Sequence, residues 1–269
     1  MLTGYKGLEE TKLFVLDMDG TFYLSDDIIE GSLDFIENVV KTGRRYLFFT
    51  NNSSKDKKLY IDKLSRMCCH IGPEDIYTSG DITINYLKKY YAGANVYVMG
   101  TPPLVESFEK AGIRLRQNMD EDADIVVVGF DMTLTYEKLE HTCTLIRNGA
   151  VFLATHPDIN CPVKDGFIPD CGAFIAAISL STGKKPKILG KPYPETADMI
   201  EYVIGVEKKY TAYVGDRLYT DVACGVQNGA KGILVLSGET RPEDIEKPGI
   251  KPDYVFDRLY DIGNILRKL

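Results

Sequence analysis

Two aspartates stand two positions apart at the end of an apolar run, in the stretch LFVLDMDGT that contains Asp17 and Asp19. A buried strand that ends in this way places like charges together, which is unfavourable unless a cation lies between them. A DG pair taken alone is most often a turn. A calcium-binding loop counted from Asp17 fails, because its fifth position is Thr21 and its twelfth is Ile28. The remaining interpretation is a carboxylate pair at the carboxyl end of a strand, where open α/β sheets bind ligands.

A second polar segment, FFTNNSS (48–54), follows another apolar run. Thr50, Asn51 and Asn52 offer hydroxyl, amide and backbone N–H donors beside an expected helix start, which is a favourable place for an anion. Ser and Asn are also preferred N-cap residues, so an ordinary helix cap explains the segment taken alone. The two roles can coexist.

A single lysine, Lys191, follows the short apolar run in ILGKPYPE (188–195). A lysine is ordinarily a solvated surface charge. Here Pro192 and Pro194 restrict the backbone around it. A cation held in such a stiff loop can serve as a point charge for phosphate.

Two further aspartates lie in YVGDRLYTDV (213–222). Asp221 stands near the start of a helical pattern and could be only a favourable helix-start charge. Asp216 ends an apolar strand, where Asp is disfavoured, so a structural explanation is weaker for it.

Strands and helices alternate along the chain and must position these residues. Helical patterns at 32–43, 135–149 and 196–206 lie between apolar runs, and Gly43 is an expected helix stop. This alternation predicts an α/β fold with a parallel sheet covered on both faces. Seven apolar runs are predicted as buried strands: 13–17, 46–50, 95–100, 124–130, 150–155, 212–216 and 232–236.

The chemically suggestive segments stand in the first 55 residues or so and again after residue 186. We therefore expect a catalytic domain formed by residues 1–81 and 182–269, with a second α/β domain inserted over residues 82–181.

The composition excludes several functions. The chain has 269 residues and a net charge of −7, which argues against binding to a nucleic-acid backbone. It has no apolar run of membrane-spanning length and its amino terminus lacks the apolar core of a signal peptide. Its six cysteines match no zinc spacing, so we expect reduced thiols and a cytoplasmic location.

Together, and in this order, the four segments resemble the motifs of the haloacid dehalogenase superfamily of phosphatases. DMDGT is similar to the first motif, Thr50 to the second, Lys191 to the third, and Asp216 with Asp221 to the fourth. TNNSS, GKPYPE, GDRLYTD and ATHPD (154–158) resemble the branch with the large type IIA cap, which includes the NagD-like and p-nitrophenyl phosphatases. The resemblance covers nearly the whole chain and implies a Rossmann-like parallel-sheet core with a large inserted α/β cap domain.

The resemblance implies a phosphomonoesterase that works through an aspartyl-phosphate intermediate. Asp17 is then the nucleophile, and the side chain of Asp19 is the general acid and base. A Mg²⁺ ion would be held by the carboxylates of Asp17 and Asp216 and by the backbone carbonyl of Asp19. The cation offsets the repulsion between a carboxylate and a phosphate dianion.

The resemblance also implies a phosphate-binding set. Thr50, the backbone N–H of Asn51, and Lys191 would hold phosphate oxygens, with Asn52 in the same group. Asp221 would hydrogen-bond to Lys191 or to a metal-bound water and so hold it in place, without binding the phosphate itself.

In related enzymes the inserted domain covers the active site and selects the leaving group. Its most polar loop after a strand is THPDINCP (155–162), in which His156, Asp158 and Asn160 could contact the substrate. His156 could also be a simple packing residue. An ordinary turn built on Pro157 and Asp158 explains the same loop about as well. His70 and His141 are expected to be structural or exposed.

The expected function is therefore Mg²⁺-dependent hydrolysis of a small phosphorylated metabolite, such as a sugar phosphate, a nucleoside monophosphate or p-nitrophenyl phosphate. A phosphomutase would use the same aspartyl chemistry. A catalytically silent protein that binds a phosphorylated metabolite is the alternative from another class. The expected state is a monomer or a homodimer, with no membrane or nucleic-acid partner.

Overall fold

The computed structural model describes residues 5–163 and 165–268 and forms two compact units. Unit 1 consists of the described residues within Met1–Thr50, Lys57–Tyr77 and Lys191–Leu269. Unit 2 consists of the described residues within Asn51–Asp56 and Thr78–Gly190. Unit 2 extends beyond the 82–181 expected for the insertion and includes a short segment that directly follows Thr50. That it acts as a cap stays a prediction.

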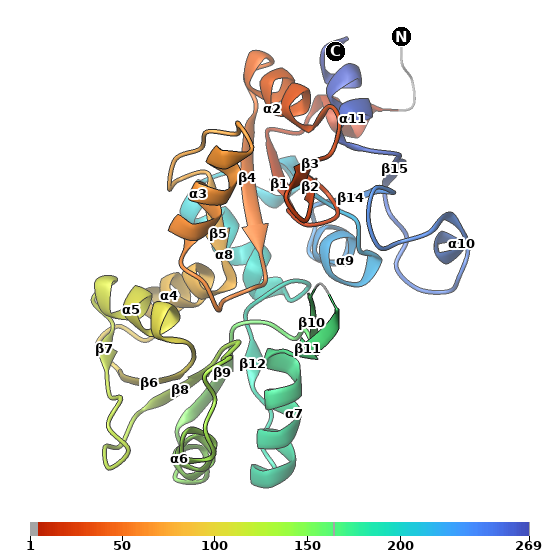
Figure 1. Cartoon of the computed structure of the whole chain (residues 1–269). Coiled ribbons are helices and arrows are strands. Elements are labelled where there is room, and N and C mark those ends of the chain that lie inside the picture. Colours follow the sequence, from red (N-terminus) through yellow and green to blue (C-terminus); the bar gives the residue numbers. More distant parts are fainter. Residues whose placement is uncertain (1–4, 164, 269) are drawn as a thin grey trace. The chain divides into compact units, whose positions relative to one another are not determined.

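Unit 1 is built around a mainly parallel sheet (Figure 1). Among the described residues this sheet has six strands in the order β15-β14-β13-β1-β4-β5. The ladders that join β4, β1, β13, β14 and β15 are parallel. The strands are β1 (Leu13–Leu16), β4 (Arg45–Thr50), β5 (Ile76–Thr78), β13 (Thr211–Gly215), β14 (Lys231–Val235) and β15 (Tyr254–Phe256). The residues that directly follow β1, β4 and β13 therefore lie on the same side of the sheet, at the carboxyl ends of these parallel strands.

The central strand β1 is buried on both faces, with every residue at most 2% exposed. This explains why its sequence shows no alternation of polar and apolar residues. On one face, Phe14 meets Phe35 of helix α2 (Ser32–Lys41), edge to face, with ring centroids 5.6 Å apart. Helix α11 (Leu259–Leu266) packs beside α2 over this face (Figure 1). Removing a ring such as Phe14 would cost about 3–5 kcal/mol.

The other elements of unit 1 connect and cover the sheet. Helix α2 ends before Gly43, which has φ 72°, as the sequence pattern predicts. The remaining elements are α1 (Lys6–Glu9), the hairpin strands β2 (Tyr23–Leu24) and β3 (Asp27–Ile28), α3 (Lys57–Arg66), α8 (Pro194–Ile204), the 3₁₀ helix η1 (Lys208–Tyr210), the π-helical turn η2 (Leu218–Val222), α9 (Ala223–Val226) and α10 (Pro242–Ile245).

Unit 2 has a smaller parallel sheet of its own. In the described part of the chain its strand order is β12-β9-β8-β6-β7, and every ladder in it is parallel. Helix α4 begins with a capping box, in which Asp81 N donates to Thr78 Oγ1 and Thr78 N donates to the Asp81 carboxylate. The elements are α4 (Ser79–Tyr90), β6 (Asn95–Met99), α5 (Pro102–Lys110), β7 (Arg114–Leu115), β8 (Ile125–Val128), α6 (Tyr136–Arg147), β9 (Val151–Ala154), the hairpin β10 (Asn160–Val163) and β11 (Gly166–Pro169), α7 (Cys171–Thr182) and β12 (Lys187–Ile188).

All seven strands predicted from apolar runs are present, with ends that differ by one or two residues. The expected helix start beside Asn52 is wrong, because α3 begins only at Lys57. The short strands β5 and β15 were not predicted. Among the described helices, none has the length and apolar character needed to cross a membrane.

Candidate active site

The centre of the predicted site in unit 1 is a buried amine between two carboxylates. Lys191 Nζ donates to Asp17 Oδ1 at 2.7 Å and to Asp221 Oδ1 at 2.6 Å. It also donates to the carbonyl oxygen of Phe49 in β4, at 3.2 Å. Lys191 is only 3% exposed, so these bonds replace the water that an ammonium group would otherwise need. Three segments far apart in the sequence therefore meet at one cation.

Asp216 follows β13 and lies beside Asp17 and Asp221. The three carboxylates offer oxygens that lie within 4.8 Å of one another. Thr21 Oγ1 donates to Asp216 Oδ1 at 3.4 Å, and Glu239 N donates to Asp216 Oδ2 at 2.7 Å. The loop of the first motif comes close because Gly20 has φ 84° and no side chain. A Cβ there would lie 2.7 Å from Asp216 Cγ, too close for a real side chain.

Burial and neighbouring negative charges raise the pKa values of two carboxyl groups in this cluster. Burial raises the pKa of Asp17 to about 7; Lys191 acts against that shift, and the carboxylates of Asp221 and Asp216 add to it. Burial and the charge of Asp221 raise the pKa of Asp216 to about 6. Burial alone would lower the pKa of Lys191, but the attraction of Asp17 and Asp221 outweighs it and raises that pKa. The site therefore carries more negative charge at neutral pH than one lysine balances.

A divalent cation fits the donors of this cluster. The ligand atoms are carboxylate oxygens only, which suit a hard cation such as Mg²⁺. Burial, with the neighbouring carboxylates adding to it, raises the pKa values of Asp17 and Asp216, and a bound cation would favour their charged forms.

The side chain of Asp19 is placed differently from that of Asp17. Among the described residues, the carboxylate cluster takes Asp17, Asp216 and Asp221 but not Asp19. Asp19 is exposed, while Met18 beside it is buried. Thr50 is the last residue of β4 and is half-buried. The first two predicted aspartates therefore have separate surroundings.

The predicted residues Asn51 and Asn52 group with unit 2 by their contacts. The side-chain amide of Asn51 donates to both carboxylate oxygens of Asp158, at 3.3 Å each. The side-chain oxygen of Asn52 accepts from the N–H and the hydroxyl of Ser54, at 2.9 and 2.7 Å. Asn52 thus shapes a local turn.

His156 lies in the interior of unit 2 and is fully buried. Its Nε2 pairs with Asp170 Oδ1 at 2.9 Å and its Nδ1 with Thr155 Oγ1 at 2.9 Å. A substrate contact through this ring would require that network to open. Asp158, which is half-buried, bonds to Asn51 as described above.

Two residues near the cluster were missed by the sequence reasoning. Arg217 directly follows Asp216, and its Nε lies 3.0 Å from Glu239 Oε2. Burial alone would lower the pKa of the guanidinium, but the carboxylates of Asp17 and Asp221 outweigh it and raise that pKa. Glu239 belongs to the polar segment LSGET after β14, which is the signal that could have pointed to this loop.

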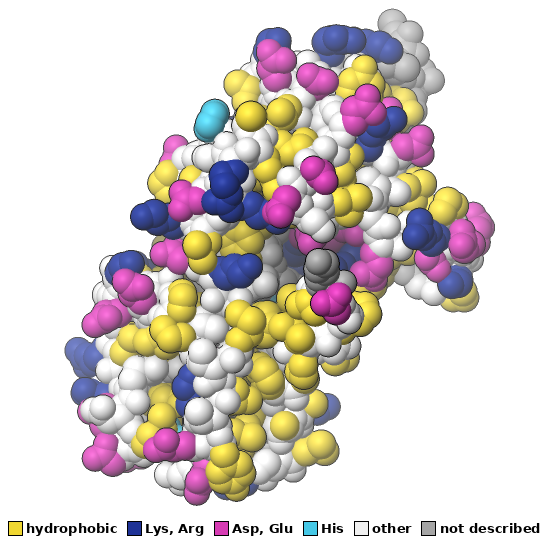
Figure 2. Space-filling model, in the orientation of Figure 1, with side chains coloured by type: hydrophobic (Ala, Val, Ile, Leu, Met, Phe, Trp, Pro, Cys, Tyr) yellow, Lys and Arg dark blue, Asp and Glu magenta, His cyan; other side chains and the backbone are white. Residues whose placement is uncertain are grey.

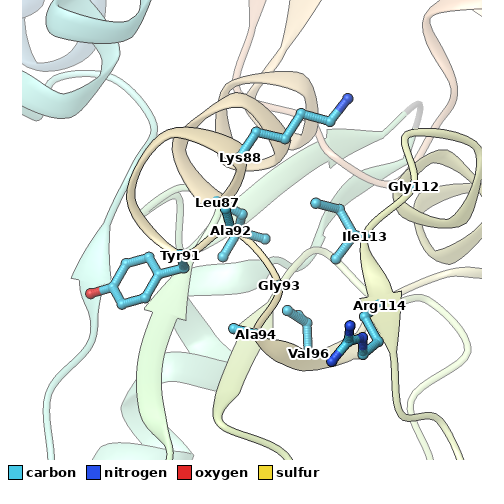
Figure 3. Close-up of a pocket in the computed structure, with 10 residues that line it drawn as sticks. All are labelled: Leu87, Lys88, Tyr91, Ala92, Gly93, Ala94, Val96, Gly112, Ile113 and Arg114. Carbon is cyan, nitrogen blue, oxygen red and sulfur yellow. The ribbon is translucent and has the colours of Figure 1, made fainter.

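Two further features lie outside the cluster, a face of mixed charge and a pocket in unit 2. On the face shown in Figure 2, basic side chains are interspersed with acidic ones. A pocket of about 240 Å³ lies in unit 2 between the end of α4 and β7, with Leu87, Val96 and Ile113 in its lining (Figure 3). None of the site residues predicted from the sequence lines this pocket. The side chain of Lys88 extends away from the other labelled residues in Figure 3.

Comparison with known proteins agrees with the geometry. The family of haloacid dehalogenase-like hydrolases matches residues 14–114, and a second HAD-hydrolase-like family matches residues 188–262. A curated relative, the acid sugar phosphatase of Staphylococcus aureus (strain MRSA252), is 35% identical over 94% of this chain and 96% of its own. The chain belongs to the haloacid dehalogenase-like hydrolases.

Solved structures place this hydrolase within the superfamily. The crystal structure of 4-nitrophenylphosphatase from Thermotoga maritima is 46% identical, with a TM-score of 0.91, and the match covers 96% of this chain and 98% of that one. NagD from E. coli K-12 is 28% identical, with a TM-score of 0.86 and coverage of 93% and 98%. The hydrolase is thus a member of the NagD-like and p-nitrophenyl phosphatase branch, which confirms the resemblance seen in its motifs.

Proposed function

We propose that this hydrolase is a Mg²⁺-dependent phosphomonoesterase that acts on small phosphorylated metabolites through an aspartyl-phosphate intermediate. One observation carries the proposal: Lys191 bonds to Asp17 and Asp221 in a buried cluster that also holds Asp216. The names of its relatives support the substrate class, since they include an acid sugar phosphatase and a 4-nitrophenylphosphatase.

In the proposed first step, a carboxylate oxygen of Asp17 attacks the phosphorus atom, and the bond from phosphorus to the leaving oxygen breaks. Asp19 gives a proton to that oxygen. Its side chain is exposed and is not part of the cluster of three carboxylates, so it is separate from the attacking group. The ester leaves as an alcohol, and the phosphoryl group stays on Asp17.

In the second step, water attacks the phosphorus atom of the aspartyl phosphate. Asp19, now a carboxylate, takes a proton from that water, and the bond between phosphorus and Asp17 breaks. Inorganic phosphate is released, and both aspartates return to their starting state.

Positive charge must surround the transferring group in both steps. Lys191 supplies a fixed charge, because Asp17, Asp221 and the Phe49 carbonyl hold its amine in place. Thr50 and the backbone N–H of Asn51 would donate to phosphate oxygens. Mg²⁺, held by Asp17, Asp216 and the backbone carbonyl of Asp19, would supply the remaining positive charge. With a net charge of −7, the protein attracts an anionic substrate through these local groups and not through its overall field.

A panel of phosphate esters tests this function. Purified protein with Mg²⁺ is incubated with p-nitrophenyl phosphate, several sugar phosphates and several nucleoside monophosphates, and released inorganic phosphate is measured. We expect release from p-nitrophenyl phosphate and from at least one metabolite. Conversion of a substrate to its isomer without release would identify a phosphomutase, and binding without any turnover would identify a silent binding protein. Either result would overturn the proposal.

A further inference from the structure

The segment that follows the predicted phosphate-binding residue Thr50 is anchored inside unit 2. Asn51 is only 6% exposed. Its side-chain amide donates to both carboxylate oxygens of Asp158, at 3.3 Å each, and its carbonyl oxygen accepts from the hydroxyl of Ser79. Two side chains from separate parts of unit 2 therefore hold Asn51 at both its side chain and its backbone. The Ser79 hydroxyl fixes the peptide plane that joins Asn51 to Asn52, and Asp158 fixes the Asn51 side chain, so the residue that directly follows Thr50 is held on two sides.

The loop that carries Asp158 is itself rigid. Gly172 N donates to the carbonyl oxygen of Asp158 at 2.7 Å. Two residues earlier, the fully buried His156 pairs with Asp170 and Thr155, at 2.9 Å each. Buried networks with all partners satisfied hold one geometry. Asp158 is thus presented to Asn51 from a fixed support.

The same loop also packs against the chain that leads into Lys191. A Cβ on Gly190 would lie 2.6 Å from the carbonyl oxygen of Thr155 and 2.6 Å from His156 Cβ. Only glycine allows this close approach. Leu189 N donates to the carbonyl oxygen of Ala154 at 2.9 Å. Loop 155–158 therefore lies against both stretches of unit 2 that continue directly into the predicted phosphate-binding residues.

We propose that Asp158 is a positioning residue for the phosphate site and makes no contact with the substrate's leaving group. It holds Asn51 so that the Asn51 N–H and the neighbouring Thr50 hydroxyl meet phosphate oxygens in the right direction. A carboxylate repels a phosphate dianion, so its effect is transmitted through the Asn51 amide and not by direct contact. This inference rests on the proposed function and assigns a part of the same site.

The test separates the phosphate group from the leaving group. In Asp158→Ala, the inhibition constant of inorganic phosphate should rise about tenfold, the expected size for losing a hydrogen bond to a charged group. The kcat/KM values for p-nitrophenyl phosphate and for a sugar phosphate should fall by that same factor. An unchanged inhibition constant, with unequal losses for the two esters, would show that Asp158 contacts the leaving group and would overturn the proposal.

Further variants guard against a general loss of structure. Asp158→Asn keeps the volume and one acceptor oxygen, so it should restore part of the phosphate affinity. Ser79→Ala removes the hydroxyl that holds the Asn51 carbonyl and should weaken phosphate binding for both esters equally. Because Asp158→Ala and Ser79→Ala both act on Asn51, the double variant should raise the inhibition constant of phosphate by less than the product of the two single increases. An increase equal to that product would count against a common action on Asn51.

A matched control lies at the other end of the unit 2 sheet. Asp124 is another carboxylate that accepts a hydrogen bond within unit 2, in this case from Asn95 N at 2.8 Å, and Asp124→Ala should leave phosphate affinity unchanged. Binding of inorganic phosphate is measured by calorimetry in the presence of Mg²⁺, alongside the melting temperature of each variant. If the unaltered protein released phosphate from no ester, the proposed function would be wrong. The calorimetric comparison with Asp158→Ala would still decide the role of Asp158.

Discussion

Lys191 Nζ lies 2.7 Å from Asp17 Oδ1, although 174 positions separate the two residues in the sequence. This pair brings the end of the central strand β1 and the loop before α8 to one point. The lysine stabilises the charged form of Asp17, but burial and two neighbouring carboxylates outweigh it, and the pKa of Asp17 stands at about 7. Burial therefore favours the neutral form of Asp17 even beside the lysine.

Replacing the proposed nucleophile should abolish turnover without unfolding the protein. Asp17→Asn deletes the attacking carboxylate oxygen, and we expect hydrolysis of p-nitrophenyl phosphate to fall at least about a thousandfold. The melting temperature should not fall, because Asp221 still pairs with Lys191 at 2.6 Å. The control is Asp34→Asn, an exposed carboxylate in the first turn of α2, which should keep full activity. Near-normal turnover by Asp17→Asn would remove this residue from the mechanism.

The proposed acid should matter most when the leaving group is a poor one. In Asp19→Asn the leaving oxygen receives no proton, so an alkyl phosphate should lose far more activity than p-nitrophenyl phosphate, whose phenolate leaves readily. The kcat values for both esters are compared with those of the unaltered protein. Equal losses for the two would contradict a proton-donating role. Asp27→Asn, an exposed change in the adjacent hairpin strand β3, serves as the control.

Removal of divalent cations should abolish activity. Treatment with EDTA followed by dialysis leaves the carboxylates of Asp17, Asp216 and Asp221 within 4.8 Å of one another without a balancing cation. Added Mg²⁺ should restore phosphate release, and calorimetry should detect Mg²⁺ binding without substrate. Asp216→Asn should weaken that binding, while Asp34→Asn should not. Full activity in a sample shown by elemental analysis to hold no metal would contradict the proposed cofactor.

Much of this architecture could be predicted because apolar runs report burial directly. The run LFVL before Asp17 is buried on both faces, and its lack of alternation is what predicts a parallel sheet. The strands β5 and β15 were missed because each has three residues, too few to show a pattern. The late start of α3 was missed because TNNSS contains good N-cap residues. In the structure Asn52 forms a local turn with Ser54 instead.

The aspartates predicted to be catalytic stand out in the sequence because Asp is disfavoured in and at the end of a buried strand. Arg217 and Glu239 carry a weaker signal, since charged residues are common in loops. The interior position of His156 was equally hidden, because its partners Asp170 and Thr155 are ordinary residues in the sequence. Contacts between side chains on different elements depend on the tertiary fold, and local patterns do not report them.

The stability of the metal-free protein should fall as the pH rises from about 4 to about 7. The folded-state pKa of Asp17 is raised from 3.8 to about 7, and that of Asp216 from 3.8 to about 6. Between these values the native state keeps protons that the unfolded chain has released. The stabilising contribution is therefore complete below pH 3.8 and is lost as the pH passes the raised values. The free energy of unfolding by urea, measured in EDTA at pH 5 and pH 8, should show this decline.

Two comparisons isolate the cluster from other titrating groups. The double variant Asp17→Asn with Asp216→Asn lacks both shifted carboxyls, so its free energy of unfolding should decline less between pH 5 and pH 8. Mg²⁺ competes with protons for the same oxygens, so it should stabilise the unaltered protein more at pH 8 than at pH 5. Equal declines in the variant and the unaltered protein would show that these two carboxyls do not titrate as the structure indicates. Because no catalytic turnover enters this measurement, it tests the electrostatics of the cluster independently of the proposed reaction.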